Sequence, residues 1–246
     1  EGKIALITGA SKGIGRAIAL AMADVGADII ATARTEEELR ELCEEIKEKG
    51  RRAKYIVADL RSTEEAKAMA QRALEIFGRV DILVNNAGVS YPQPALETTE
   101  DRWDETFQIN LKSLFFLTQI IARAMVKQGG GKIVNISSQA GLVGLEDHAA
   151  YCATKGGLIL LTKVLAIEWG KYKINVNAVA PTIIMTPMAE RAWADVKRRE
   201  EALKKIPLGR FGKAKDVVGA VIFLASPYAD LITGAVLPID GGYTAQ

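Results

Sequence analysis

Thr8-Gly9-Ala10-Ser11-Lys12-Gly13-Ile14-Gly15 joins an apolar run at residues 3–8 to a helical stripe that extends from Ile14 to Val25. Glycines between a strand and a helix let the backbone approach a ligand closely, and the helix N-terminus offers free amides and a positive dipole end to a pyrophosphate. The spacing is Gly-x-x-x-Gly-x-Gly rather than Gly-x-Gly-x-x-Gly, so a dinucleotide site is indicated by the strand-to-helix context and not by the usual fingerprint.

Apolar runs and helical patterns alternate along the rest of the chain. Strands are predicted at residues 3–8, 28–33, 53–58, 80–85, 132–137, 174–180 and 235–239. Alternation of this kind is typical of a parallel sheet with helices on both faces. We therefore predict an α/β protein with a single-domain, doubly wound Rossmann-type fold over residues 1–246 and a seven-stranded parallel sheet. Residues 182–210 interrupt this alternation of strands and helices, and they are expected to form a substrate-loop excursion at the strand ends.

Composition narrows the class of protein. The chain is 49% hydrophobic and 25% charged, with a net charge of +2 and no long block of one sign, so neither nucleic acid nor a membrane is expected as a partner. No run approaches membrane-spanning length, and the chain enters a strand at once instead of a signal peptide. Two cysteines, Cys43 and Cys152, fit a reducing compartment, which predicts a cytoplasmic protein with no metal.

The end of the second predicted strand bears on the choice of cofactor. NAD-selective folds place an acidic residue there for the ribose hydroxyls, whereas this chain has Ala33 followed by Arg34. Arg34 is a fork-shaped donor suited to a phosphate, and Lys12 could add a second cation. We expect NADP(H) to be preferred over NAD(H); the alternative is that both cations are ordinary surface charges.

Four residues form the candidate catalytic group. Ser138 follows a strand-like run, and Tyr151 and Lys155 stand four apart on one helical face. A nearby ammonium lowers the pKa of a phenol, which would let Tyr151 transfer a proton while Ser138 polarises a carbonyl. Asn110 lies in an apolar helical run, where its amide serves either a water-linked proton path to Lys155 or a core hydrogen bond to nearby backbone.

These motifs resemble the classical short-chain dehydrogenase/reductases over essentially the whole chain. The matching pieces are Thr8–Gly15, Asp59, Asn85-Asn86-Ala87-Gly88, Asn110, Ser138, Tyr151 and Lys155. The resemblance implies that Asn110, Ser138, Tyr151 and Lys155 form a catalytic tetrad and that Asp59 bonds the adenine. It also implies a homotetramer built through the helices that contain Asn110 and Tyr151. The implied cofactor-binding residues are Gly9, Ser11, Lys12, Gly13, Ile14, Gly15, Arg34, Thr35, Asp59, Leu60, Asn86, Ala87, Gly88, Tyr151, Lys155, Pro181, Ile184 and Thr186.

Within that family the chain looks like the L-xylulose reductase (dicarbonyl reductase) and sugar-alcohol dehydrogenase branch. The resemblance implies that Gln139, His148 and Trp193 line the substrate pocket with Ser138 and Tyr151. His148 and Trp193 could instead be structural. Thr182 stands where most members have glycine, which puts the path of the following loop in question.

The expected function is therefore NADP(H)-dependent interconversion of a ketone and a secondary alcohol on a ketose, polyol or small dicarbonyl. One alternative is 3-oxoacyl-[acyl-carrier-protein] reductase, with a basic docking patch formed by Arg123, Lys127, Lys171 and Lys173. Another is a non-catalytic dinucleotide-binding regulatory protein, since a fold alone does not prove chemistry.

Overall fold

β1 (Ile4–Thr8) is buried on both faces, which places it inside a two-sided sheet. Ala5 and Ile7 pack into one apolar cluster, and Ile4 and Leu6 pack into another, as the alternation of side chains along a strand requires. The computed structural model describes residues 2–186, 189–190 and 193–245.

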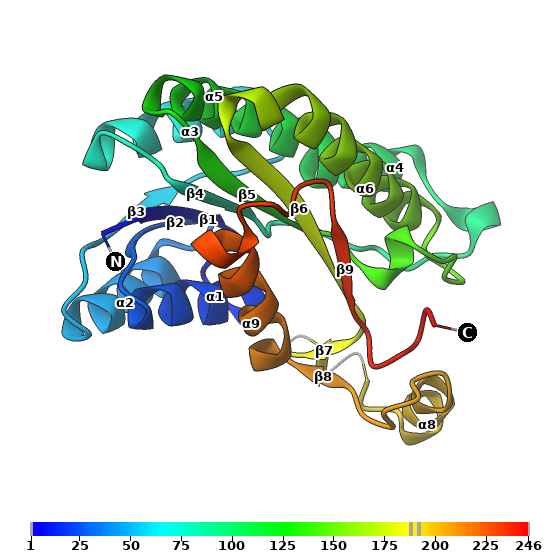
Figure 1. The fold of residues 1–246 in the computed structure, drawn as a ribbon. Helices are drawn as coiled ribbons and strands as arrows, with labels where there is room; N and C mark the ends of the chain where they lie inside the picture. Colours follow the sequence, from blue (N-terminus) through cyan, green and yellow to red (C-terminus); the bar gives the residue numbers. More distant parts are fainter. Residues whose placement is uncertain (1, 187–188, 191–192, 246) are drawn as a thin grey trace.

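The main sheet has seven parallel strands, as predicted, and their order is β3-β2-β1-β4-β5-β6-β9 (Figure 1). The strands after β1 are β2 (Asp28–Ala33), β3 (Ala53–Val57), β4 (Ile82–Asn85), β5 (Gly131–Ile136), β6 (Ile174–Pro181) and β9 (Val236–Ile239). Because β2 and β4 lie on opposite sides of β1, the strand order reverses at β1. Ligands of such sheets bind beyond the carboxyl ends of the strands at this switch point.

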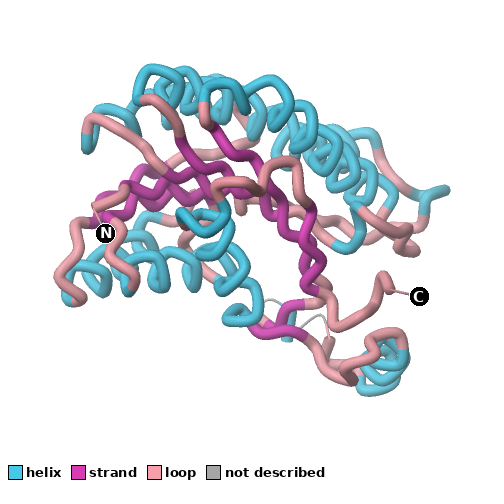
Figure 2. The backbone as a smooth tube through the Cα atoms, in the orientation of Figure 1, coloured by secondary structure: helices cyan, strands magenta, loops and turns pink. Residues whose placement is uncertain are grey.

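Helices cover both faces of the sheet, with α1, α2 and α9 on one side and α3, α4, α5 and α6 on the other (Figures 1 and 2). Their bounds are α1 (Gly13–Asp24), α2 (Glu36–Glu48), α3 (Thr63–Phe77), α4 (Glu100–Phe107), the π-helical segment η2 (Gln108–Ser113), α5 (Leu114–Gln128), α6 (Ala149–Trp169), α8 (Val196–Lys204) and α9 (Ala214–Ala225). Short 3₁₀ turns are η1 (Ala95–Glu97), η3 (Gln139–Gly141), η4 (Gly170–Tyr172) and η5 (Pro227–Ala229).

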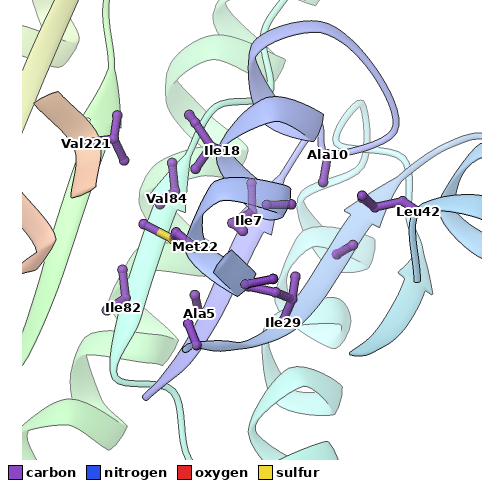
Figure 3. Packing of buried hydrophobic residues seen from close by; sticks show 14 of the residues in the cluster. Ala5, Ile7, Ala10, Ile18, Met22, Ile29, Leu42, Ile82, Val84 and Val221 are labelled. Atoms are coloured by element: carbon purple, nitrogen blue, oxygen red, sulfur yellow. The ribbon is translucent and has the colours of Figure 1, made fainter. Parts of the chain in front are cut away.

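Apolar side chains fill the space between the sheet and each helical layer. Figure 3 shows Ile18 and Met22 of α1 packed beside Ile7 and Val84 of the sheet, with Val221 of α9 nearby. Complete burial of a large aliphatic side chain contributes about 1.5–3 kcal/mol. The two layers therefore hold the sheet rigidly and leave its carboxyl edge for loops.

Two helical stretches are longer and more apolar than the sequence suggested. Glu100–Gln128 and Ala149–Tyr172 each reach the length and hydropathy of a membrane span, contrary to the expectation that no run does. Their most apolar windows are 50% and 44% buried inside the protein. These helices are core helices of the α/β fold, and about half of each apolar window is buried against the sheet or neighbouring helices.

The predicted excursion at 182–210 leaves the sheet after β6. Its described part contains β7 (Ile184–Met185), which pairs in parallel with β8 (Gly212–Lys213), and α8, which stands apart from the main sheet (Figure 1). The excursion thus lies beyond the carboxyl edge, where it can cover a ligand.

Candidate active site

The glycine-rich loop between β1 and α1 has no room for side chains at two positions. A Cβ at Gly15 would lie 2.3 Å from the Gly9 carbonyl oxygen and 2.4 Å from Asn86 Nδ2. Gly9 also has φ +64°, a conformation that favours glycine. The loop is therefore a close backbone cradle at the start of α1, with Ser11, Lys12, Gly13 and Ile14 around the turn, which fits a pyrophosphate.

Asn86 and Thr8 connect this cradle to the loop after β4. Asn86 Nδ2 donates to the carbonyl oxygens of Thr8 and Gly9 at 2.9 and 3.0 Å, and the amides of Asn86 and Ala87 both donate to Thr8 Oγ1 at 3.0 Å. The side chain of Thr8 was not among the predicted site residues. Its position at the last residue of the strand, facing the neighbouring strand end, is the signal that could have identified it.

The two cations predicted to contact the adenosine, Arg34 and Lys12, differ in their surroundings. Arg34 is exposed just after β2, and Thr35 is the N-cap residue of α2 without a capping side-chain bond. Lys12 is not free, because its Nζ lies 2.8 Å from Glu38 Oε1. This acidic partner was not predicted from the sequence.

Asp59 follows β3 and is bound by Arg61. The guanidinium Nε donates to Asp59 Oδ2 at 2.8 Å, and this bonding holds the pKa of the carboxyl below its usual range. Leu60 beside it is buried. A cavity of about 650 Å³ is lined by Arg61 and by residues of α4 and η2, and no tetrad residue lines it.

Ser138, Tyr151 and Lys155 meet beyond the end of β5. The Ser138 hydroxyl is close enough to the phenol of Tyr151 to lower its pKa, and it accepts a hydrogen bond from the amide of Ala140 at 3.1 Å. Lys155 Nζ lies 5.6 Å from the centroid of the Tyr151 ring and donates to the carbonyl oxygen of Ile136 at 2.8 Å. The helical spacing of four residues thus brings the two side chains to one place, as predicted from the sequence.

Burial dominates the electrostatics of this group. It raises the pKa of Tyr151 above the ordinary value, and the hydrogen bond from Ser138 offsets only part of that rise. Burial also lowers the pKa of Lys155 to about 8. The expected lowering of the Tyr151 pKa by Lys155 is not found in the protein alone. Because desolvation disfavours both charged forms, the phenol stays protonated, which is the form that donates a proton.

Asn110 occupies η2, where the backbone widens into a π turn between α4 and α5. Its Oδ1 accepts from the amide of Val89 at 2.8 Å, and its Nδ2 donates to the carbonyl of Val89 at 2.9 Å and to Thr154 Oγ1 at 3.2 Å. A Cβ at Gly88 would lie 3.2 Å from Asn110 Oδ1 and 3.5 Å from Lys155 Nζ. The Asn110 amide therefore makes hydrogen bonds to nearby backbone, which was the predicted alternative to a water-linked proton path. These bonds nevertheless lie close to Lys155.

A chain of buried polar groups beneath the tetrad was missed. Asn85 Nδ2 donates to Thr118 Oγ1 and to Asn135 Oδ1, and Asn135 Nδ2 donates to Thr162 Oγ1, at 2.8–2.9 Å. These bonds join β4 and β5 to α5 and α6 and fix the helix that carries Tyr151. Asn85 and Asn135 are amides inside otherwise apolar strands, and this pattern could have predicted the network, since buried polar groups need hydrogen-bond partners.

The predicted substrate residues gather at the same edge, although not all are open to it. His148 precedes α6, its ring centroid lies 6.1 Å from that of Tyr151, and its Nδ1 lies 2.6 Å from the carbonyl oxygen of Glu146. Gln139 is buried, and its Oε1 has no hydrogen-bond partner in the described part of the chain. Trp193 packs against Phe211 with ring centroids 5.3 Å apart, so it belongs to the contact between the excursion and the segment that leads to β8.

The loop after β6 follows a path that Thr182 can adopt. Among the described residues, the only non-glycine positions with positive φ are Asp147 and Lys173. Pro181 ends β6, where its carbonyl oxygen lies 3.5 Å from Ser138 Oγ, and Ile184 is buried in β7. Thr186 reaches the glycine loop, because a Cβ at Gly13 would lie 3.3 Å from its Cγ2. Residues 181–186 thus run between the tetrad and the cradle.

The donor set at this edge fits a nicotinamide dinucleotide. Gly9 and Gly15 keep the loop backbone tight against Asn86, Arg34 and Lys12 supply two cations beside the start of α2, and the Tyr151 group lies beyond the end of β5. Each lies in the loop that follows a parallel strand or in the first turn of the helix after it, so all lie at one edge of the sheet.

Comparisons with known proteins agree with this arrangement. A family model described as enoyl-(acyl carrier protein) reductase matches residues 9–244. L-xylulose reductase of Bos taurus is 44% identical over 99% of this chain and 97% of its own length. An NAD-dependent glycerol dehydrogenase of Listeria innocua is 40% identical over 99% of this chain and 94% of its own.

Solved structures give the same result. A gluconate 5-dehydrogenase from Burkholderia cenocepacia J2315, in complex with NADP and tartrate, superimposes with a TM-score of 0.95 at 35% identity, covering 100% of this chain and 96% of that one. The seven-stranded sheet, the glycine-rich turn and the full-length relatives lead to one conclusion: the chain belongs to the short-chain dehydrogenase/reductase family of oxidoreductases.

Proposed function

We propose that this protein interconverts a ketone and a secondary alcohol on a ketose, polyol or small dicarbonyl, with NADP(H) preferred over NAD(H). The observation that carries the proposal is the placement of the Tyr151 phenol beside the Ser138 hydroxyl, with Lys155 Nζ 5.6 Å from the centroid of the Tyr151 ring. Relatives named for a ketose, glycerol and gluconate support a hydroxylated substrate.

In the reductive direction Ser138 hydrogen-bonds the carbonyl oxygen and polarises the C=O bond. The nicotinamide cofactor, when bound, supplies a hydride to the carbonyl carbon. Tyr151 gives its phenolic proton to the oxygen, which completes the secondary alcohol. Lys155 is still largely protonated at neutral pH, since burial lowers its pKa only to about 8, and its charge stabilises the phenolate left behind.

Asn110 serves as a positioning residue in this proposal. Its bonds to Val89 and Thr154 tie the loop after β4 to the helix that carries Tyr151 and Lys155. A π-helical turn at such a place is a feature often found at functional sites.

Gln139, His148 and Trp193 are proposed to line the substrate pocket, with residues 182–210 covering it. Support comes from the position of the His148 ring at the edge of Tyr151 and from the contact of Trp193 with Phe211. Polar side chains at a pocket favour substrates with several hydroxyl groups, because analogues without them leave buried groups unpaired.

A homotetramer in the cytoplasm is proposed as the working form. Leu160, Val164 and Ile167 of α6 are exposed and share one helical face, and an assembly through α6 would cover them.

Tyr151→Phe tests the mechanism. We expect loss of at least about 10²-fold in turnover, the usual contribution of a proton-transferring side chain, with unchanged binding of NADPH in a fluorescence titration. The control is Tyr172→Phe, a tyrosine of η4 away from the tetrad. Undiminished turnover by Tyr151→Phe would refute the mechanism.

A substrate panel separates the alternatives. The description of the matching family model favours acyl-carrier substrates. Arg123 and Lys127 lie in the last part of α5, Lys171 lies in η4 and Lys173 follows it, and the two segments meet where Gly131 N donates to the Lys173 carbonyl. That contact lies at the edge of the sheet opposite the tetrad. Higher kcat/KM on xylulose than on an acetoacetyl thioester supports the polyol proposal, and the reverse supports an acyl-carrier reductase. Cofactor binding without turnover would favour a regulatory protein.

A further inference from the structure

An ion pair joins the glycine loop to the start of α2. Lys12 Nζ lies 2.8 Å from Glu38 Oε1, and Glu38 belongs to the acidic first turn of α2. Lys12 is one of the two cations assigned to the adenosine 2′-phosphate. The cation that would contact this phosphate therefore already has an anionic partner.

Glu38 is held in its charged form. The hydrogen bond from Lys12 lowers the pKa of the Glu38 carboxyl, partial burial opposes this, and the neighbouring Ser11 side chain lowers it again. Oε2 of the same carboxylate is buried, without a hydrogen-bond partner in the described part of the chain. The carboxylate is therefore a fixed negative charge beside two residues of the glycine loop.

We propose that Glu38 is a specificity-determining residue whose carboxylate competes with the 2′-phosphate of NADP(H) for Lys12, and so limits the preference for NADP(H) over NAD(H). The inference deepens the proposed function and rests on its preference for NADP(H), together with the sequence-based prediction that Lys12 contacts the phosphate. NAD(H) has a 2′-hydroxyl in place of the 2′-phosphate, and this neutral group does not compete for the Lys12 ammonium. Lys12 can therefore stay paired with Glu38 when NAD(H) binds.

The size of the effect follows from exposure. The Lys12 side chain is 58% exposed and that of Glu38 33%, so the pair is screened by solvent and salt. Exposed ion pairs contribute about 0.2–1 kcal/mol, which corresponds to about 1.5- to fivefold in a dissociation constant. Glu38 is therefore expected to adjust the cofactor ratio, with Arg34 still free to turn toward the phosphate.

Glu38→Gln removes the charge and keeps the size of the side chain. Calorimetry on the whole protein with adenosine 2′,5′-bisphosphate and with 5′-AMP measures the adenosine end without any carbonyl substrate. We expect Glu38→Gln to bind the bisphosphate about 1.5- to fivefold more tightly, with unchanged binding of 5′-AMP, and the gain to shrink at high salt.

Two further variants make the test specific. Glu45→Gln removes another α2 carboxylate, one that pairs with Arg16 of α1, and should leave both affinities unchanged. In a Lys12→Ala background Glu38→Gln should give no gain. A gain that persists without Lys12, or an unchanged or weaker bisphosphate affinity in Glu38→Gln, would overturn the inference.

The outcome for the cofactor proposal is separate. Wild-type protein that binds NADPH no more tightly than NADH would refute the preference for NADP(H). The role of Glu38 is then still decided by whether Glu38→Gln changes the ratio of bisphosphate to 5′-AMP affinity.

Discussion

Lys155 shows how burial couples chemistry to stability. Its pKa falls from 10.5 to about 8 because the ammonium is desolvated, and this difference corresponds to about 3 kcal/mol of unfavourable charge burial. Between pH 8 and 10.5 the unfolded chain binds more protons at this residue than the folded chain does. The contribution of Lys155 to the free energy of unfolding therefore rises with pH across that window and is at its lowest below pH 8.

Lys155→Met should lose activity and gain stability at neutral pH. Removing the buried charge gains about 3 kcal/mol, and losing the hydrogen bond to Ile136 costs about 1 kcal/mol, so a net increase of about 2 kcal/mol in the free energy of unfolding is expected at pH 7. Urea denaturation at pH 7 and at pH 9.5 measures it, and the advantage should narrow at the higher pH. Lys163→Met, at an exposed position on the same helix, serves as the control. A variant less stable than wild type at pH 7 would contradict the argument.

The loop between β1 and α1 depends on the absence of a side chain at Gly15. Gly15→Ala would force its Cβ against the Gly9 carbonyl and Asn86 Nδ2, and the backbone atom cannot move aside without displacing β1. We expect a loss of about 1–3 kcal/mol in stability, typical of overpacking, together with loss of NADPH binding. Thermal unfolding and fluorescence titration measure the two effects.

Gly219→Ala provides the matched control, because Gly219 also lies in a helix but has nothing within 4 Å of an added Cβ. That variant should be stabilised by about 0.5–1 kcal/mol. Equal changes in stability and in NADPH binding for the two variants would show that crowding of the added Cβ is not the reason for glycine at position 15.

Elements with a strong periodic pattern were predictable, and those made by tertiary contact were not. All seven strands lie within two residues of their predicted ends, because each is a compact apolar run between turn residues. The π turn around Asn110 has no such signature. The pairing of Ile184–Met185 with Gly212–Lys213 joins short segments far apart in sequence, and the ion pair of Lys12 with Glu38 depends on how α2 packs against the glycine loop.

The molecule as a whole leaves one face of α6 uncovered. Leu160, Val164 and Ile167 repeat at helical spacing, and Ile167 is 83% exposed. This is the helix that carries Tyr151 and Lys155, so an assembly through it would also brace the catalytic residues.

Ile167→Glu should disrupt the proposed tetramer, because a charge buried at an interface is unfavourable without a partner. Light scattering after size-exclusion chromatography should show a smaller species than wild type. Val25→Glu, at an exposed apolar position at the end of α1, should keep the wild-type mass. If wild type itself elutes as a monomer, the tetramer proposal fails.

The last turn of the chain touches the end of the excursion. Leu208 N donates to the carbonyl of Gly241 at 3.0 Å, a Cβ at Gly242 would lie 2.9 Å from Pro207, and Asp240 closes the turn by accepting from Gly242 N and Thr244 N. An affinity tag fused after Gln246 would therefore lie close to the proposed cover of the pocket. A tag placed before β1 would emerge at the amino ends of the strands, opposite the candidate active site. It is therefore the better choice for kinetic measurements.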